Sequence, residues 1–146
     1  MDENIGTLMA QVARLMRRDF DEKARSIGVT RPQWQVLSLL SRHEGINQGG
    51  LAEMLEVEPI TLGRMVDRLQ EAQLVERRPD PADRRAWRLH LTDKAHDLLR
   101  SLKPLAQEMI DLALGGIGQQ DRDDLMAALE KMRANLTRKP EIALKM

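Results

Sequence analysis

The chain has 146 residues and a mass of 16.7 kDa, enough for one compact domain with a dimerisation lobe but not for two independent cores. Its 23 basic and 23 acidic residues balance, so long-range attraction to a polyanion is modest. With no cysteine, the chain has no disulfides, thiolate metal ligands or cysteine nucleophile. Because it lacks both an apolar run of membrane-spanning length and a signal peptide, we expect a cytoplasmic protein without membrane contact.

The chain is predicted to be mainly helical. Aromatic residues are scarce, whereas Leu, Met and Ala are abundant, which favours a helical core over a sandwich or barrel. Apolar residues recur at intervals of three and four, the spacing of amphipathic helices. Thr30, Asn47 and Thr92 stand where helices should begin and are expected to cap them. The predicted helices cover about residues 5–27, 31–42, 48–55, 59–69, 93–114 and 121–136.

The helical spacing fails between residues 75 and 91. The stretches 75–78 and 87–91 flank a loop rich in Pro and Asp, and the second stretch alternates apolar and polar residues, so a β-hairpin is predicted. The hairpin is basic, since five arginines against two aspartates give a net charge of +3 over Arg77, Arg78, Asp80, Asp83, Arg84, Arg85 and Arg88. Guanidinium groups enter a narrow minor groove at lower cost than ammonium groups. The alternative is a solvated hairpin in which the charges only hold the turn.

Residues 31–92 are predicted to form a winged helix-turn-helix lobe. Their expected elements follow in the order helix, short helix, helix and two-stranded ribbon. In such a lobe one helix enters the major groove of double-stranded DNA and a basic ribbon reaches phosphates or the minor groove. The helices of residues 1–30 and 93–146 carry apolar stripes that one small lobe cannot cover, so we expect them to join two copies into a homodimer.

Several motifs in this region resemble the MarR family of transcription regulators. They are LAEML at residues 51–55, RMVDRL at 64–69, LVERRPDPADRR at 74–85 and LTDK at 91–94. The Lys94-Ala95 step and the position of Trp34 are similar to the SlyA branch of that family. The chain departs from the family at Gln73, where the family usually has a glycine that ends the recognition helix, so a conformational cost is expected there. Gly49, Gly50 and Gly63 also lower helix propensity, which would suit a unit that orders only on DNA.

The resemblance implies a homodimer that binds a palindromic operator and acts as a repressor. It places Arg64 on a guanine, Ile60 or Thr61 on a thymine methyl, and Arg68 on a phosphate. In the wing it implies that an aspartate braces the hairpin while one of the two following arginines enters the minor groove. The implied DNA contacts are Pro59, Ile60, Thr61, Arg64, Arg68, Asp83, Arg84 and Arg85.

The resemblance also implies a small aromatic or anionic effector, held in a cleft between the two kinds of lobe. Trp34 would supply a flat wall, and Arg14, Arg17 and Arg18 a partner for a carboxylate. The alternatives are a core role for Trp34 and a solvated helix face for the three arginines.

Other functions have weaker support in the sequence. The three histidines share no ligand spacing, and no nucleophile-base set or phosphate-binding loop is present, so we expect no metal, no cofactor and no enzyme. The alternative function is a winged-helix protein-interaction module that has given up DNA binding, which the balanced charge and the extra glycines would permit. Only the DNA-binding regulator predicts duplex binding that weakens steeply with salt.

Overall fold

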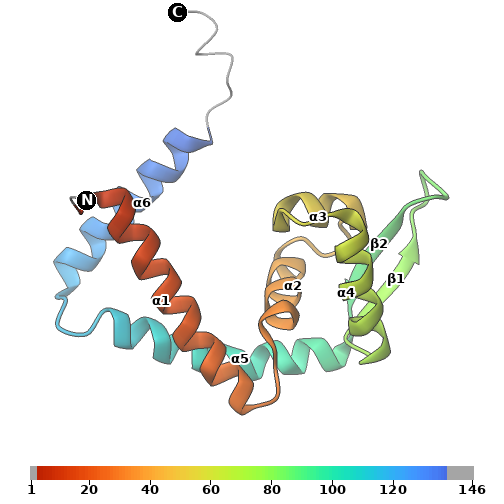
Figure 1. The fold of residues 1–146 in the computed structure, drawn as a ribbon, viewed down its shortest axis with the longest axis horizontal. Helices are drawn as coiled ribbons and strands as arrows, with labels where there is room; N and C mark the ends of the chain where they lie inside the picture. The colour runs from red at the N-terminus through yellow and green to blue at the C-terminus, as the bar shows by residue number, and fades with distance from the viewer. Residues whose placement is uncertain (1–2, 138–146) are drawn as a thin grey trace, which may run out of the picture. The chain divides into compact units, whose positions relative to one another are not determined.

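The computed structural model describes residues 3–137, which form six helices and one two-stranded sheet (Figure 1). The helices are α1 (Ile5–Ser26), α2 (Arg31–Arg42), α3 (Gln48–Leu55), α4 (Pro59–Glu71), α5 (Asp93–Ala113) and α6 (Gln119–Leu136), and the strands are β1 (Val75–Pro79) and β2 (Trp87–Leu91). The chain divides after Met109 into two compact units. The mainly helical prediction with a small two-stranded wing is confirmed.

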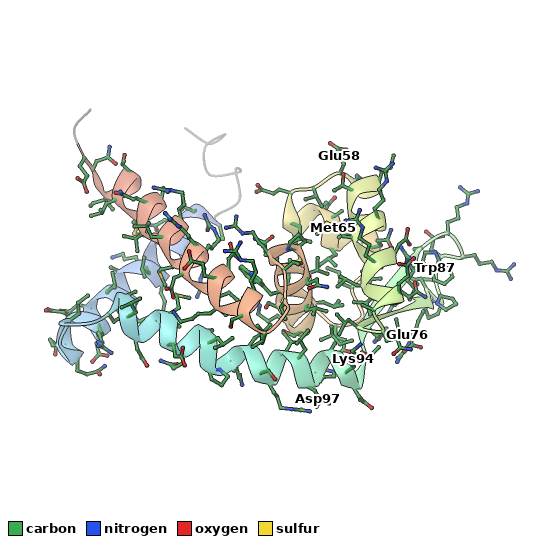
Figure 2. All side chains as sticks on the ribbon, turned by 60° about the horizontal axis from the view of Figure 1, so that its bottom comes forward. Glu58, Met65, Glu76, Trp87, Lys94 and Asp97 are labelled. Carbon is green, nitrogen blue, oxygen red and sulfur yellow. The ribbon has the colours of Figure 1, made fainter. Side chains whose placement is uncertain are left out.

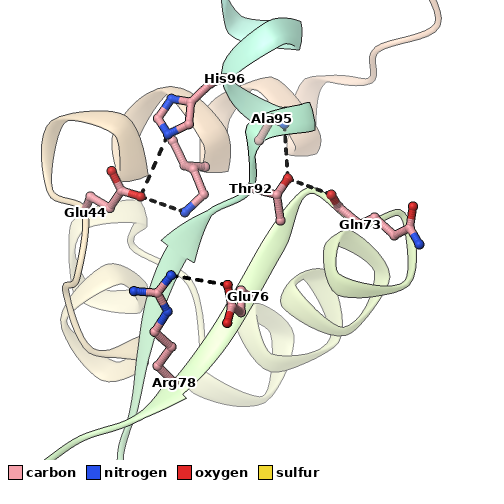
Figure 3. A network of polar contacts seen from close by, with 8 residues as sticks. Glu44, Gln73, Glu76, Arg78, Thr92, Ala95 and His96 are labelled. Atoms are coloured by element: carbon pink, nitrogen blue, oxygen red, sulfur yellow. Dashed lines mark hydrogen bonds and ion pairs between the residues drawn. The ribbon is translucent and has the colours of Figure 1, made fainter.

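The predicted helix caps are all formed. The Thr30 hydroxyl accepts from the Gln33 amide at 3.4 Å, and the Gln33 side chain accepts from the Thr30 amide at 2.9 Å, which completes a capping box at α2. Asn47 Oδ1 accepts from the Gly50 amide at 2.7 Å and starts α3. Thr92 Oγ1 accepts from the Ala95 amide at 3.1 Å and starts α5 (Figure 3). Local sequence therefore fixes where three of the helices begin.

The core of the winged lobe lies among α2, α3, α4 and the hairpin. Its fully buried side chains come from every one of these elements and include Leu37, Leu40, Leu51, Leu62, Val66 and Leu89. The strands pair antiparallel, with Val75 opposite Leu91 and Pro79 opposite Trp87. Because alternate strand residues face the same side, Leu89 and Leu91 turn inward together and attach the base of the hairpin to the helices.

Helix α4 ends in a strained turn, as predicted from Gln73. Gln73 has φ of 63°, a left-handed conformation that glycine adopts more readily. The Leu74 amide donates back to the Leu69 carbonyl at 2.9 Å, and the Gln73 carbonyl accepts from the Thr92 hydroxyl at 2.7 Å (Figure 3). These bonds hold the turn where α4 passes into β1, so they offset the conformational cost of placing Gln73 instead of glycine there.

A second core within residues 3–109 joins α1, the α1–α2 turn and α5. Its buried members are Phe20, Ala24, Val29 and Leu102. The amino-terminal half of α1 is different, because its apolar stripe is exposed and comprises Ile5, Leu8, Val12 and Leu15. The unit that begins at residue 110 has no buried residue in α6, whose Leu125, Met126, Leu129 and Leu136 are exposed. Within the described residues, no helix has both the length and the apolar character needed to cross a bilayer.

Candidate nucleic-acid interface

The exposed face of α4 carries the side chains predicted to meet a DNA groove. Leu62, Val66 and Leu69 are buried, so the opposite side of this helix faces solvent. Pro59 lies in its first turn and Ile60 is 72% exposed. The remaining predicted contacts, Thr61, Arg64 and Arg68, are also exposed. The structure therefore brings the five α4 candidates to the solvent side of one helix.

Arg64 and Arg68 keep their charges available for a ligand. Among the residues that the structure describes, neither guanidinium has an ion pair or a side-chain hydrogen bond. Their separation of four residues places them one helical turn apart on the same face. Two free forked donors in this position suit guanine edges and phosphate oxygens.

The turn at the hairpin tip is held by its two aspartates. Asp80 Oδ1 accepts from the Ala82 amide at 2.8 Å, and Asp83 Oδ1 accepts from the Arg85 amide at 2.9 Å. The Ala82 hydrogen bond holds the pKa of Asp80 below its usual value, and Arg88, with Nε 3.4 Å from Oδ2, adds to the effect. Asp83 thus has its carboxylate on the backbone of the turn, where the resemblance implies a brace.

The five hairpin arginines have separate roles. Arg78 pairs with Glu76 at 3.3 Å across one face of β1 (Figure 3), and Arg88 pairs with Asp80. Within residues 3–137, Arg84 and Arg85 have no side-chain hydrogen bond or ion pair, and both are exposed at the tip. The positive charge available to a ligand is thus concentrated on Arg84 and Arg85, the two arginines of which the resemblance implies that one enters the minor groove.

Arg77 has a role that the sequence did not reveal. Its guanidinium turns toward α3 and α4, where it donates to Asp67 Oδ1 at 2.6 Å and to the Gly63 carbonyl at 3.1 Å. It also donates to the side chains of Gln48 and Gln70. A count of hairpin charges cannot separate this arginine from its neighbours. The distinguishing feature is its register, because Arg77 pairs with the buried Leu89 and shares its inward face.

Only two of the four predicted effector residues line the same cleft. Arg17 and Trp34 line a mainly apolar cleft of about 380 Å³, together with Met16 and Phe20. Arg14 and Arg18 are exposed on α1 and are not among the lining residues. Trp34 stacks edge-on against Phe20, with ring centroids 4.9 Å apart, so it is both a core anchor and a cleft wall.

An ion pair fixes the indole of Trp34. Asp21 Oδ1 accepts from Trp34 Nε1 at 2.7 Å, and Asp21 Oδ2 accepts from Arg31 Nε at 2.5 Å. Burial alone would raise the pKa of Asp21, but the hydrogen bonds from Arg31 and Trp34 outweigh it and hold the pKa below its usual value. Asp21 was not identified from the sequence, since its two partners lie 10 and 13 residues away.

A second cleft within the first unit adjoins α2 and α5. It has a volume of about 650 Å³ and an apolar floor that includes Phe20 and Leu102. Its basic lining residues, which the sequence did not single out, are Arg42, His96, Arg100 and Lys103. His96 also lies 4.0 Å from Glu44, which accepts from the Leu91 amide at 3.0 Å (Figure 3). In the part of the chain that the structure describes, no three His, Asp or Glu side chains are grouped as a metal site.

An exposed arginine-bearing helix, stacked on a short helix and flanked by an arginine-tipped ribbon, defines a winged helix-turn-helix protein. Comparison with known proteins shows which family this lobe resembles. The model of the MarR family matches residues 29–87. These findings, with the relatives described next, support a transcriptional regulator of the MarR family.

The relatives share most of their length with this chain. The HTH-type transcriptional repressor NicR of Pseudomonas putida is 28% identical over 130 residues, which cover 89% of this chain and 82% of NicR. A MarR transcriptional regulator from Methanosarcina mazei Go1 is 28% identical, with a TM-score of 0.80 over 90% of this chain and 94% of that one. A mutant MarR from E. coli complexed with operator DNA is 26% identical, with a TM-score of 0.74 over 88% of this chain and 92% of that one.

Proposed function

We propose that this protein is a repressor that binds a palindromic operator as a homodimer. The free arginines on α4 and at the hairpin tip are the observation that carries the proposal. Arg64 and Arg68 project from the helix, and Arg84 and Arg85 from the ribbon, without partners among the described residues. These four unpaired arginines lie on the two elements that a winged helix uses to hold a duplex. The operator complex of an E. coli MarR supports the same use of the fold.

Each contact has a proposed role in the groove. Arg64 binds guanine O6 and N7, Thr61 or Ile60 meets a thymine methyl, and Arg68 contacts phosphate. Pro59 sets the first turn of α4 at the groove. In the wing, Asp83 braces the turn while Arg84 or Arg85 enters the minor groove.

Dimerisation is assigned to the two ends of the chain. We divide the protein into residues 1–30 and 93–146, which join two copies, and the lobe of residues 31–92, which binds DNA. Exposed apolar side chains on the first half of α1 and along α6 support this division, because water-exposed stripes of this kind favour burial against another surface. Two recognition helices in a symmetric dimer then enter successive major grooves about 34 Å apart.

Release by a small aromatic or anionic effector is assigned to the Trp34 cleft. The apolar walls suit an aromatic ring, and the exposed Arg17 suits its carboxylate. Arg14 and Arg18 serve as outer cations on the same helix. We further propose a SlyA-like regulator on the basis of the Lys94-Ala95 step and the position of Trp34. Lys94 donates to the Ala72 carbonyl at 2.9 Å and so joins α5 to the end of α4.

Duplex binding at several salt concentrations tests the proposal. The repressor should lose affinity linearly on a logarithmic salt scale, and the Arg84→Ala/Arg85→Ala variant should show weaker binding to all sequences with a shallower slope. Arg78→Ala is the matched control, since that arginine already pairs with Glu76. A dimer that ignores every duplex at low salt would instead be a protein-interaction module.

A further inference from the structure

Trp87 is an exposed aromatic residue that neither the core nor the proposed DNA contacts use. It begins β2, is 45% exposed and lies outside the buried cluster that joins the hairpin to the helices. Figure 2 shows it where the hairpin projects beyond α4. Among the described residues, its indole Nε1 donates no hydrogen bond, whereas that of Trp34 is bonded to Asp21. The exposed indole therefore presents an apolar ring and a free donor that a ligand can use.

The strand register places Trp87 on the inner face of the wing. Side chains alternate along β2, so Trp87 points to the same side as the buried Leu89 and Leu91. Trp87 pairs with Pro79, which shares a face of β1 with Arg77, and Arg77 reaches the side of α4. The indole therefore lies on the face that turns toward the recognition helix.

This face is the part of the wing that a bound DNA strand must cross. In the proposed function, α4 lies in a major groove and the hairpin tip in the adjacent minor groove. Adjacent grooves of a duplex are separated by one sugar-phosphate strand. That strand passes between α4 and the tip, and Trp87 lies between the Arg77 contact with α4 and the Arg84-Arg85 tip.

We infer that Trp87 binds this strand, with its indole N–H donating to a phosphate oxygen and its ring packed on deoxyribose. The inference rests on the proposed DNA-binding function. It adds an uncharged side chain to the arginines that contact DNA in that proposal. A neutral donor positions the wing on the backbone of any sequence but releases no counterion. Trp87 consequently affects affinity and leaves the salt dependence unchanged, whereas each arginine affects both.

The test compares wild type, Trp87→Phe and Arg85→Ala on a mixed-sequence duplex long enough for two half-sites, over a range of salt. Phenylalanine keeps an aromatic ring at the position opposite Pro79 and removes the donor. A hydrogen bond to a charged group predicts that Trp87→Phe binds about tenfold more weakly, with a salt slope parallel to that of wild type. Arg85→Ala should give a shallower slope. Thermal unfolding and sedimentation establish that each variant is folded and assembled like wild type.

Tryptophan emission provides a second readout, because the chain contains two tryptophans and no tyrosine. Duplex should shift the emission of wild type and shield it from acrylamide, and this change should be absent in Trp87→Phe. Equal affinity of Trp87→Phe and wild type overturns the inference but leaves the DNA-binding function intact. A shallower slope for Trp87→Phe also overturns it, since the indole would then only hold the arginines in place. If wild type itself shows no salt-dependent binding, the proposed function fails, and the inference fails with it.

Discussion

Arg77 on the wing donates to Asp67 Oδ1 of the recognition helix at 2.6 Å, and only 17% of the arginine side chain is exposed. The same guanidinium donates to the Gly63 carbonyl, Gln48 Oε1 and Gln70 Oε1. One side chain therefore joins β1 to both helices of the helix-turn-helix. In the proposed function α4 and the wing reach adjacent grooves at once, so this network would set the angle between them before a duplex binds.

Replacing Arg77 should destabilise the lobe. Arg77→Ala removes charge-assisted hydrogen bonds in a partly enclosed position and should cost about 1 to 3 kcal/mol of unfolding free energy. Arg77→Lys should recover little of this lost stability, because one ammonium cannot reach acceptors on two helices as the guanidinium does. Urea unfolding measures both. Arg78→Ala, which breaks an exposed pair next to it in sequence, should change stability by less than about 0.5 kcal/mol. Equal stability of Arg77→Ala and Arg78→Ala would contradict the network.

Arg64 and Arg68 should affect binding in different ways. Arg64→Ala should cost about 1 to 3 kcal/mol on the selected operator and relax base preference at one position in each half-site. Arg68→Ala should weaken binding to all sequences alike and lower the salt slope by about one for each phosphate that the side chain neutralises. Selection from a randomised duplex pool, followed by titration at several salt concentrations, distinguishes the two. A selected sequence that is identical for wild type and Arg64→Ala would remove Arg64 from base recognition.

The sequence predicted the features of the fold that depend on neighbouring residues. Thr30 with Gln33, Asn47 and Thr92 each bond to an amide three residues away, so their pattern identified the helix starts. The cost at Gln73 was also visible, because the resembled family usually has a glycine at this position and Gln73 adopts the left-handed conformation there, with φ of 63°. The alternation in β2 identified the hairpin for the same reason.

The contacts between distant segments could not be predicted in this way. Asp67 lies 10 residues before Arg77, and Asp21 lies 13 residues before Trp34, so no local period relates either pair. Sequence reasoning listed five hairpin arginines and singled out Arg84 and Arg85 as wing contacts, but it could not assign Arg77 to the helices. That assignment depends on strand register and on the packing of the hairpin against α4, which are tertiary properties.

Asp21 makes the free energy of unfolding depend on pH. Its pKa is lower in the folded protein than the ordinary 3.8, so its charged form stabilises the fold. That contribution is complete above the unfolded pKa and is lost as the pH falls through the folded pKa. Asp21→Asn should therefore cost about 1 to 3 kcal/mol near neutral pH, and the difference from wild type should shrink below the ordinary aspartate pKa of 3.8.

Urea unfolding of both proteins across this acid range measures the effect. Asp19→Asn is the control, because Asp19 pairs with Lys23 only within the same helix, at 2.6 Å, and should cost about 0.5 kcal/mol or less. A difference between Asp21→Asn and wild type that stays constant down to the lowest pH would show that the carboxylate charge does not hold Arg31 and Trp34.

Gly49 and Gly50 are adjacent in the first turn of α3 but should respond in opposite ways to alanine. A Cβ on Gly50 would lie 3.2 Å from Ile46 Cδ1 and 3.2 Å from Asn47 Oδ1, the atom that caps the helix. A Cβ on Gly49 would have ordinary contact at 3.6 Å with the same oxygen. Gly50 is thus needed for close packing of the helix start, whereas Gly49 mainly lowers helix propensity.

Gly49→Ala should raise the unfolding free energy by up to about 1 kcal/mol, the helix-propensity gain of alanine over glycine. The unfolding free energy of Gly50→Ala should be lower than that of Gly49→Ala by about 1 kcal/mol or more, because Ile46 or the Asn47 cap must move to admit the methyl group. Urea unfolding gives the two values, and exchange of the backbone amide at position 50, in wild type and in Gly50→Ala, reports whether the Asn47 cap survives. Equal stabilisation by both alanines would show that the start of α3 yields freely, as expected of a helix that becomes ordered only on DNA.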